Sequence, residues 1–195
     1  MTMLKKNSEV NNMSNINKTK VITGEVRLSY ANVWEPKSIN GGKERYSVSV
    51  IIPKSDQKTI EKIEKAVDAA IDEGLSKFNG KKPNKKAIKL PLRDGDTEKD
   101  DKAYADAYFL NANSMTAPQI VDRNVEPILD RSEVYSGVYA RVSLNFYAYN
   151  VNGNKGVAVG LGNIQKLRDG QPLGNRSNAA DDFDAMDDDD EDFLA

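Results

Sequence analysis

Hydrophobic and polar residues alternate with a period of two over much of the chain, which predicts β-strands whose two faces differ. Five segments have this pattern, at residues 20–30, 44–53, 103–114, 134–151 and 155–167. A short additional strand is expected near Gln119–Val121. Asn152-Gly153 separates the last two long segments, and this dipeptide is typical of a two-residue turn, although NGNKG could also form a slightly longer loop. These two strands are therefore expected to pair as an antiparallel hairpin.

The first of these strands separates into two faces by parity. The face predicted to be buried comprises Ile22, Val26, Leu28 and Tyr30. Gly24 interrupts the pattern, as glycine does at a bulge or a bend. In the second strand Tyr46 has the parity of Val48 and Val50, so we expect it in the core.

Between residues 55 and 78 the period changes to that of an α-helix. The apolar positions recur three and four residues apart, at Ile60, Ile63, Val67, Ala70, Ile71, Leu75 and Phe78. Ser55 or Asp56 can cap the start of this helix, and Gly80 follows its end. One amphipathic helix is therefore expected to pack on the sheet with its charged face in solvent.

Five strands with one helix inserted between the early and the late ones indicate a small β-barrel. An oligonucleotide-binding (OB) type barrel, mainly β with five antiparallel strands and one amphipathic α-helix, is the simplest match, and a sandwich with a side helix is the alternative. Four regions are predicted: a disordered N-terminal extension (1–18), the barrel domain (19–168), a linker (169–180) and a disordered acidic tail (181–195).

The strand within residues 134–151 has an apolar face and an aromatic, hydrogen-bonding face. The second face carries Tyr139, Arg141, Ser143, Asn145, Tyr147 and Tyr149. Tyrosine rings on an open sheet can stack on nucleobases, and an arginine can contact phosphate or a base plane. We predict that Tyr139, Arg141, Tyr147 and Tyr149 contact nucleic acid. The alternative is that these tyrosines cover a barrel end or pack under a loop.

The lysine loop, defined here as residues 81–93, is the second candidate site. Its cations are Lys81, Lys82, Lys85, Lys86, Lys89 and Arg93, and it contains no acidic residue. A polyanion could bind such a loop through counterion release, whereas the alternative is a set of solvated lysines. The predicted contacts are Lys85, Lys86, Lys89 and Arg93. Trp34, the only tryptophan, is expected either to stack on a base or to fill the core.

Charge is distributed unevenly along the chain. Nine of the 30 acidic residues lie in residues 181–195 without any base, so the remaining residues have 21 acids against 28 bases and a net charge of +7. Such a tail cannot fold on itself and resembles nucleic acid in charge density. We expect it to compete for a basic groove and to recruit partner proteins, and the alternative is a tail that only increases solubility. The tail residues predicted to do so are Asp187, Asp188, Asp189, Asp190, Glu191, Asp192 and Phe193.

The chain contains no cysteine and no histidine, which removes disulfides, Cys-based zinc sites and the commonest general base. We therefore expect no enzymatic activity, no cofactor and no metal site. The acidic run around Asp94 and Asp96 does not fit a calcium loop, because Lys99 and Ala105 occupy the positions that need Gly and Glu. No segment approaches the roughly 18 apolar residues of a membrane span, so a cytoplasmic protein without membrane contact is expected.

Several sequence blocks resemble a family of tailed-bacteriophage single-stranded DNA-binding proteins. These blocks are NGGKERYSVSVIIPKSD, LPLRDGD, YFLNANS and YSGVYARVSLNFYAYNVNGNKGVAVGLGNIQKLRDGQPLG, and the resemblance spans about residues 19–178. It implies an OB-like barrel that coats single-stranded DNA (ssDNA) in phage replication, recombination or repair, in the host cytoplasm and without base specificity. Proteins of this type resemble other replication proteins in having an acidic, aromatic-ended tail, which residues 181–195 match in character.

The residues and the resemblance together predict a sequence-independent ssDNA-binding protein. Its expected partners are ssDNA and, through the tail, phage or host replication proteins, and self-association is a further expectation. Two alternatives remain open at this point. One is a metal-dependent nuclease that uses carboxylates such as Asp94 and Asp96, and the other is a structural or adaptor phage protein whose tyrosine face packs against a protein.

Overall fold

A computed structural model describes residues 17–38 and 40–174 of the chain. The predicted N-terminal extension lies outside these residues except for residues 17 and 18. The predicted acidic tail and the second half of the predicted linker also lie outside them. The four predicted region boundaries therefore remain predictions.

The described residues form one mainly β structure, which confirms the predicted fold class. The strands are β1 (Lys20–Ile22), β2 (Val26–Lys37), β3 (Arg45–Pro53), β4 (Arg93–Asp94), β5 (Ala107–Ser114), β6 (Ile120–Val121), β7 (Tyr139–Val151) and β8 (Asn154–Arg168). The helices are α1 (Gln57–Glu73) and α2 (Gly95–Glu98), with 3₁₀ turns η1 (Leu75–Phe78), η2 (Lys85–Ala87), η3 (Lys102–Tyr104) and η4 (Arg131–Glu133).

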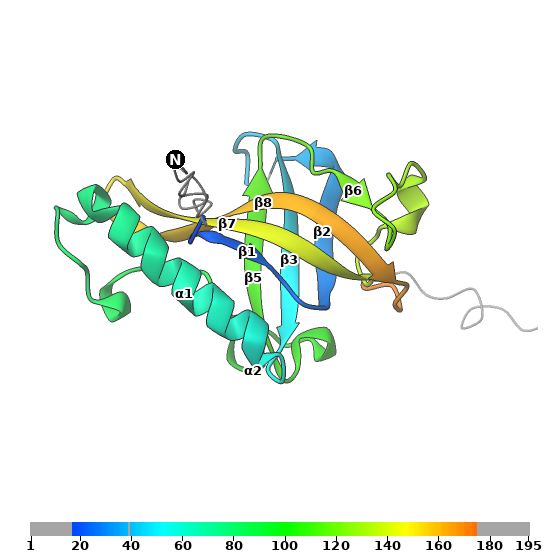
Figure 1. Ribbon diagram of the computed structural model, residues 1–195, viewed down its shortest axis with the longest axis horizontal. Helices are drawn as coiled ribbons and strands as arrows, with labels where there is room; N and C mark the ends of the chain where they lie inside the picture. Colours follow the sequence, from blue (N-terminus) through cyan, green and yellow to red (C-terminus); the bar gives the residue numbers. More distant parts are fainter. Residues whose placement is uncertain (1–16, 39, 175–195) are drawn as a thin grey trace, which may run out of the picture.

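Five long strands make a partly closed ring in the order β2, β3, β5, β8, β7 and back to β2. The pairs are antiparallel except β5–β8, which is parallel with Asn113 opposite Gly160. The ring returns to β2 where Val26 lies opposite Ala140 of β7. In Figure 1, β2, β3 and β5 run side by side while β7 and β8 cross them. This arrangement is the OB-type barrel predicted from the sequence.

Helix α1 begins at its predicted cap and covers one side of the barrel. The side chain of Asp56 accepts a hydrogen bond from the backbone N–H of Thr59 at 3.1 Å. The helix ends before Gly74, where an added Cβ would lie 2.3 Å from the Cβ of Ala148 on β7. Only glycine permits this close approach, so the single helix predicted to reach Phe78 is divided into α1 and η1. No helix in the described part of the chain is long and apolar enough to cross a membrane.

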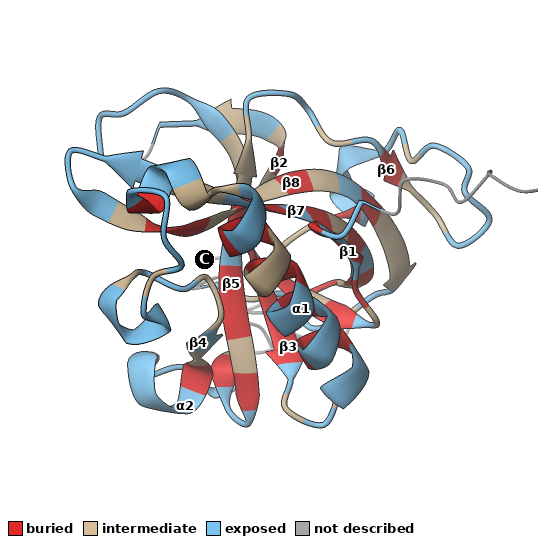
Figure 2. Ribbon diagram, turned by 60° about the vertical axis from the view of Figure 1, so that its left-hand side comes forward, coloured by how far each residue is buried: buried red, intermediate tan, exposed pale blue. Residues whose placement is uncertain are grey.

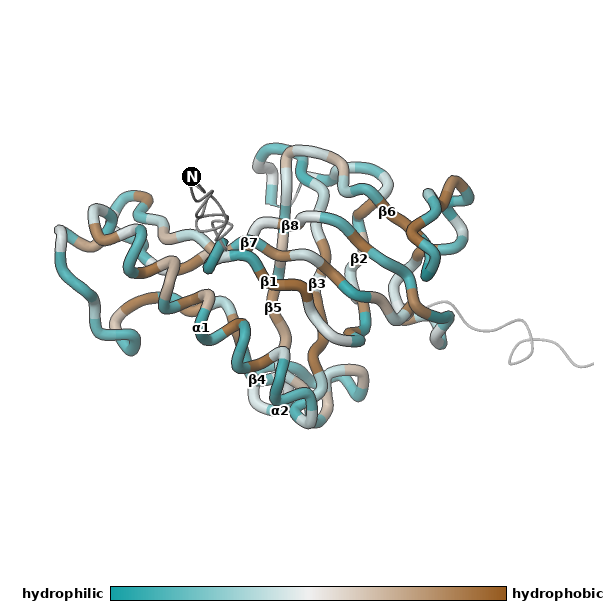
Figure 3. The backbone as a smooth tube through the Cα atoms, viewed as in Figure 1, coloured by the Kyte–Doolittle hydropathy of each residue, from teal (hydrophilic) through white to brown (hydrophobic). Residues whose placement is uncertain are grey.

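The core fills the barrel and the space beneath α1. Its fully buried members include Leu28, Val50, Ile52, Ile63, Ile71, Leu110, Leu144, Phe146 and Ile164. Figure 2 shows buried residues along β3 and β5 and exposed residues on the outer side of α1. The hydrophobic stretches in Figure 3 follow the same strands, while the connecting loops are mostly hydrophilic. Alternation in the sequence thus places one side of each strand in a common interior.

The first predicted strand differs from the prediction in two places. Gly24 separates β1 from β2, and an added Cβ there would lie 2.6 Å from a carboxylate oxygen of Asp56. In β2 a bulge follows Ser29, because Ser29 pairs with Ser49 while Asn32 pairs with Ser47. The prediction that Ile22 and Tyr30 are buried is therefore wrong, and these side chains are 46% and 66% exposed.

The later segments agree closely with the sequence pattern. Asn152 and Gly153 have φ angles of 51° and 82°, as the two-residue hairpin turn between β7 and β8 requires. Strand β6 is present at the predicted short segment. The segment between α1 and β5 contains β4 and α2, and the strand predicted for residues 103–114 begins at Ala107 as β5.

Candidate nucleic-acid interface

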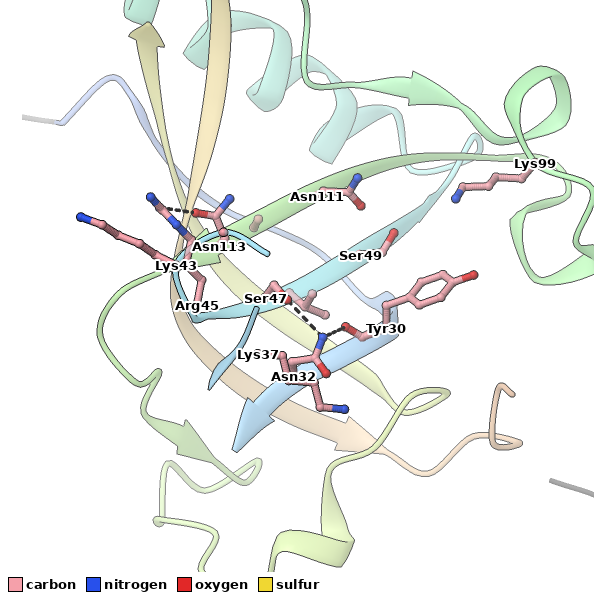
Figure 4. A pocket seen from close by; sticks show the side chains of 13 residues that line it. Tyr30, Asn32, Lys37, Lys43, Arg45, Ser47, Ser49, Lys99, Asn111 and Asn113 are labelled. Carbon is pink, nitrogen blue, oxygen red and sulfur yellow. Dashed lines mark hydrogen bonds between the residues drawn. The ribbon is translucent and has the colours of Figure 1, made fainter. Parts of the chain in front are cut away.

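A groove with a volume of about 690 Å³ lies on the outer face of β2, β3 and β5 (Figure 4). Its floor is made of small polar side chains, Asn32, Ser47, Ser49, Asn111 and Asn113. The alternation that buries Val48 and Val50 of β3 places Ser47 and Ser49 on the opposite side of the strand. Ser49 is buried there, because the Tyr104 hydroxyl covers it and donates to its Oγ at 3.2 Å. No acidic residue in the described part of the chain lines the groove.

Cations stand at both ends of this groove. The groove cations, as we call them, are Lys37, Lys43, Arg45 and Lys99. Figure 4 places Lys43 and Arg45 at one end and Lys99 at the other. Arg45 donates a 3.0 Å hydrogen bond to Asn113, and none of the four cations forms an ion pair within residues 17–38 and 40–174. Their charge therefore remains available to a polyanion.

Tyr30 supplies an exposed aromatic ring at the Lys99 end of the groove. The β2 bulge turns this residue away from the core, and Figure 4 shows its ring projecting beside Ser49. Its φ of +46° is unusual for a residue other than glycine. Such backbone strain costs of order 1–3 kcal/mol and is found preferentially at ligand sites. Ser136 supports the bulge, because its hydroxyl accepts a 2.9 Å hydrogen bond from the backbone N–H of Ala31.

Lys99 is directed toward the groove by contacts with aromatic rings. Its Nζ lies 5.6 Å from the ring centroid of Tyr30, 5.2 Å from that of Tyr104 and 5.1 Å from that of Phe109. Tyr104 and Phe109 belong to a small apolar cluster on the outer face of β3 and β5, together with Ile51 and Ala107. The ammonium group thus lies over aromatic faces that attract a cation and beside the exposed ring of Tyr30.

The loop that carries Lys99 is held by Lys54, the residue after β3. Its ammonium group lies 2.9 Å from a carboxylate oxygen of Asp94 and 2.6 Å from one of Asp96. The hydrogen bonds that Lys54 donates to Asp96 and then to Asp94 raise the pKa of Lys54 above its ordinary value. The hydrogen bond from Lys54 and then the backbone N–H of Asp106 lower the pKa of Asp96. These two acids of the nuclease alternative therefore act as structural partners of a lysine.

No group of three potential metal ligands occurs in the part of the chain that the structure describes. The acid run between Asp94 and Asp101 instead caps short helical turns. Asp94 accepts a hydrogen bond from the backbone N–H of Asp96 at 3.0 Å, and Asp101 accepts one from Ala103 at 2.9 Å. The nuclease alternative thus gains no observation in its favour.

The segment after β8 returns to the Tyr30 end of the groove. Leu173 packs against the apolar cluster of Tyr104 and Phe109, and its backbone N–H donates to the carbonyl of Ser136 at 2.8 Å. One guanidinium nitrogen of Arg27 donates to the carbonyl of Gln171 at 2.6 Å. The last described residues are thereby fixed beside the β2 bulge.

The predicted tyrosine face of β7 is open at only one of its three rings. Tyr147 is 43% exposed, while Tyr139 and Tyr149 are half-buried. The guanidinium carbons of Arg168 and Arg27 lie 3.6 and 5.4 Å from the ring centroid of Tyr139, which engages this ring within the protein. The hydroxyl of Tyr149 lies against Gly156. Arg141 is exposed and donates to the carbonyl of Thr23 at 3.2 Å.

The lysine loop is partly neutralised by acids of α1. Lys85 lies 2.6 Å from Asp68, and Lys82 lies 2.9 Å from Asp72. Lys86 and Lys89 are exposed. The backbone of Lys89 pairs with β8, donating to the carbonyl of Lys155 at 2.9 Å.

Two further predicted contacts have partners inside the protein. Arg93 forms an ion pair with Glu98, and its guanidinium lies 4.9 Å from the ring centroid of Phe109, near Lys99. Trp34 is half-buried against the core, and its indole N–H donates to the carbonyl of Val134 at 2.9 Å. DNA contact by the predicted residues on β7, in the lysine loop and at Trp34 remains a prediction.

Sequence reasoning missed the groove cations and Tyr30. A signal for the bulge exists, because buried positions change parity between Leu28 and Val33 of β2. One extra residue in a strand produces such a change and turns a residue predicted as buried outward. Ser47 and Ser49 have the parity opposite to Val48 and Val50, but a serine has neither a charge nor a ring by which the sequence could mark a nucleic-acid contact.

Comparison with known proteins identifies relatives of the whole barrel. Residues 19–194 match the family described as "Enterobacter phage Enc34, ssDNA-binding protein". The "Putative protein p50" of Acyrthosiphon pisum secondary endosymbiont phage 1 is 33% identical over 157 residues, which cover 77% of this chain and 84% of that protein.

Solved structures of two phage proteins share the fold. The single-stranded DNA-binding protein from bacteriophage Enc34 in complex with ssDNA has a TM-score of 0.70 at 21% identity, covering 80% of this chain and 90% of that chain. The single-stranded DNA-binding protein gp2.5 of bacteriophage T7 has a TM-score of 0.57 at 14% identity, covering 85% and 94%. The family and these structures are described as DNA-binding proteins and not as enzymes, which agrees with the predicted lack of enzymatic activity. The match over residues 19–194 confirms the predicted resemblance: the chain belongs to the family of the phage Enc34 ssDNA-binding protein.

Proposed function

We propose that this protein binds ssDNA without sequence selectivity in the groove of β2, β3 and β5. The observation that carries the proposal is the combination of four cations without ion pairs in the described chain and one exposed ring along a floor free of acids. The groove lies on the face where OB barrels bind oligonucleotides. The Enc34 relative, which has the same fold, was solved in complex with ssDNA.

Each part of the groove has a separate role in this proposal. Lys43, Arg45 and Lys99 contact phosphates, so binding releases counterions and weakens with salt. Tyr30 stacks on a base, and every base offers a π face of similar character. The side-chain NH₂ groups of Asn111 and Asn113 on the floor donate to whichever base edge or sugar lies above them. None of these contacts requires one base at one position.

Titration of fluorescently labelled dT oligomers tests this proposal. We expect tight binding at low salt that weakens as salt rises. Tyr30→Ala should lower affinity about 5- to 150-fold, since one stacked base contributes ~1–3 kcal/mol. Tyr30→Phe is the matched control, because it retains the ring, and it should bind like the wild type. Absence of binding at low salt, or equal affinity of Tyr30→Ala and the wild type, would contradict the proposed site.

We infer a role in phage replication or recombination, in which the protein coats exposed DNA in the host cytoplasm. The acidic tail at residues 181–195 would compete for the same groove cations and recruit phage or host replication proteins once DNA displaces it. Deleting residues 181–195 should therefore tighten ssDNA binding at low salt. The effect should fade as salt rises, because screening weakens the competition. Unchanged or weaker binding of the truncated protein at low salt would refute tail competition.

A further inference from the structure

A row of cross-strand neighbours continues the floor of the groove around the barrel. In pairing order this polar row is Asn32, Ser47, Asn113, Gly160, Asn145 and Lys20. It crosses six strands, β2, β3, β5, β8, β7 and β1. Neighbouring strands lie about 4.8 Å apart, so the row is about 24 Å long. It contains no acidic residue, and it extends well beyond the groove itself.

Gly160 is a glycine that the protein's own packing does not require. An added Cβ would lie 2.3 Å from the Lys89 carbonyl oxygen at Gly156 and 2.3 Å from the Ser143 hydroxyl at Gly162. At Gly160 the nearest atom would be the carbonyl oxygen of Asn145, at an ordinary contact distance of 3.5 Å. A glycine inside a strand weakens it and often marks a place where a ligand or another backbone approaches closely. The bare position lies next to Asn113, at the boundary of the groove.

Tyr147 provides an open ring directly beyond this glycine. It lies on the outward face of β7, two residues from Asn145, and its Cε1 would be 4.0 Å from a Cβ on Gly160. Its 43% exposure distinguishes it from the half-buried Tyr139 and Tyr149. A base that passed over Gly160 would therefore meet this ring.

The amides on both sides of Gly160 are oriented by bonds to their oxygen atoms. The side-chain oxygen of Asn113 accepts from Arg45 at 3.0 Å, and that of Asn145, at 3.1 Å, shares the Thr19 hydroxyl with the side-chain oxygen of Asn17, at 2.7 Å. Neither side-chain NH₂ group donates to another residue in the described part of the chain. These groups are therefore available as donors to phosphate or base oxygens.

We propose that ssDNA leaves the groove over Gly160 and continues to a second subsite on β7. At this subsite Tyr147 stacks on a base, and Lys20 of the neighbouring strand β1 contacts the sugar–phosphate backbone of the DNA. This inference rests on the proposed function, since it extends the path of the same ligand. OB folds occupy about 4–16 nucleotides, so a second subsite is within the range of site sizes for this fold. Longer oligomers should fill both subsites, whereas the shortest should need only the groove.

Gly160→Thr and Tyr147→Leu test this path with dT oligomers of graded length, about 4 to 16 nucleotides. Threonine suits a strand and has room for its Cβ, so its main effect is to obstruct the bare position. Each variant should bind the longest oligomer roughly tenfold more weakly than the wild type while binding the shortest equally well. The double variant should lose little more than either single one, because both changes close the same path. Melting temperatures should match or exceed that of the wild type for Gly160→Thr.

Two control variants isolate the ring from general surface effects. Tyr147→Phe retains the ring and should bind every oligomer as the wild type does. Val151→Ala shortens another exposed side chain of β7, 62% exposed and near the hairpin turn, and should also have no effect.

The outcomes separate this inference from the proposed function. If the wild type binds no oligomer, the proposed function fails. If Tyr30→Ala weakens binding while Gly160→Thr and Tyr147→Leu bind the longest oligomer like the wild type, only the path over β8 is refuted. Weaker binding of all lengths by Gly160→Thr together with a lower melting temperature would also refute it, because the glycine would then serve the fold.

Discussion

The lysine loop and the groove cations are both basic, but their surroundings differ. In the loop, Lys82 and Lys85 are paired with Asp72 and Asp68 of α1. In the groove, Arg45 bonds a neutral amide, and Lys99 lies over aromatic rings. The loop is the denser cluster in the sequence, yet among the described residues all four groove cations, but only three of the six loop cations, lack a carboxylate partner. Proximity in sequence therefore says little about the charge that a polyanion can use, because neutralising acids arrive from another element.

The strongest test of this contrast replaces each cluster separately. A variant with Lys43→Ala, Arg45→Ala and Lys99→Ala should bind ssDNA at least tenfold more weakly and reduce the slope of log affinity against log salt by about 2 units, at ~0.7 per lost phosphate contact. The loop variant with Lys85→Ala, Lys86→Ala and Lys89→Ala should reduce the same slope by a smaller amount than the groove variant does. Anisotropy titrations over a range of salt concentrations measure both slopes. A larger change in the loop variant would reverse the comparison.

A second test asks whether the acidic residues of α1 reduce the contribution of the lysine loop to DNA affinity. Asp68→Asn with Asp72→Asn retains the size of both side chains but removes the charges that pair with Lys85 and Lys82. Affinity for a long oligomer should rise a few-fold at low salt and return to the wild-type value at high salt, because exposed charges are screened. Glu61→Gln with Glu64→Gln, on the same helix, controls for net charge alone. An equal gain in the control would show that pairing is irrelevant.

The smallest expected effect concerns the loop that carries Lys99. The lowered pKa of Asp96 means that its carboxylate stabilises the fold above the ordinary Asp pKa of about 4, and that this contribution is lost as pH falls through the lowered value. Asp96→Asn should therefore melt a few degrees lower than the wild type at neutral pH, with the difference shrinking below about pH 4. Asp100→Asn, an exposed neighbour without an ion pair in the described chain, should melt like the wild type at both pH values. A difference that does not change with pH would contradict this role of Asp96.

The spacing of apolar residues and the residue types at turns and helix caps were sufficient to predict the barrel, but they were not sufficient to predict the groove. Asn152-Gly153, the Asp56 cap and the apolar face of α1 are local signals, and each appears where the sequence places it. Tyr30 could not be placed by parity alone, because the bulge that exposes it depends on how β2 pairs with β3. Lys99 lies within the acidic run of the sequence, and the fold of the loop around Lys54 brings it over Phe109.

The anchoring of Leu173 beside the β2 bulge affects the proposed competition between the acidic tail and DNA. The described chain ends at residue 174, and Leu173 packs beside the Tyr30 end of the groove, so the tail competition proposed above would be intramolecular. In general, a short flexible linker between two binding segments gives an effective local concentration of the order of millimolar, independent of the amount of protein. Competition between this segment and DNA would then depend on the concentration and length of the DNA and not on protein concentration, and dilution would leave the occupancy of the groove by its own chain unchanged.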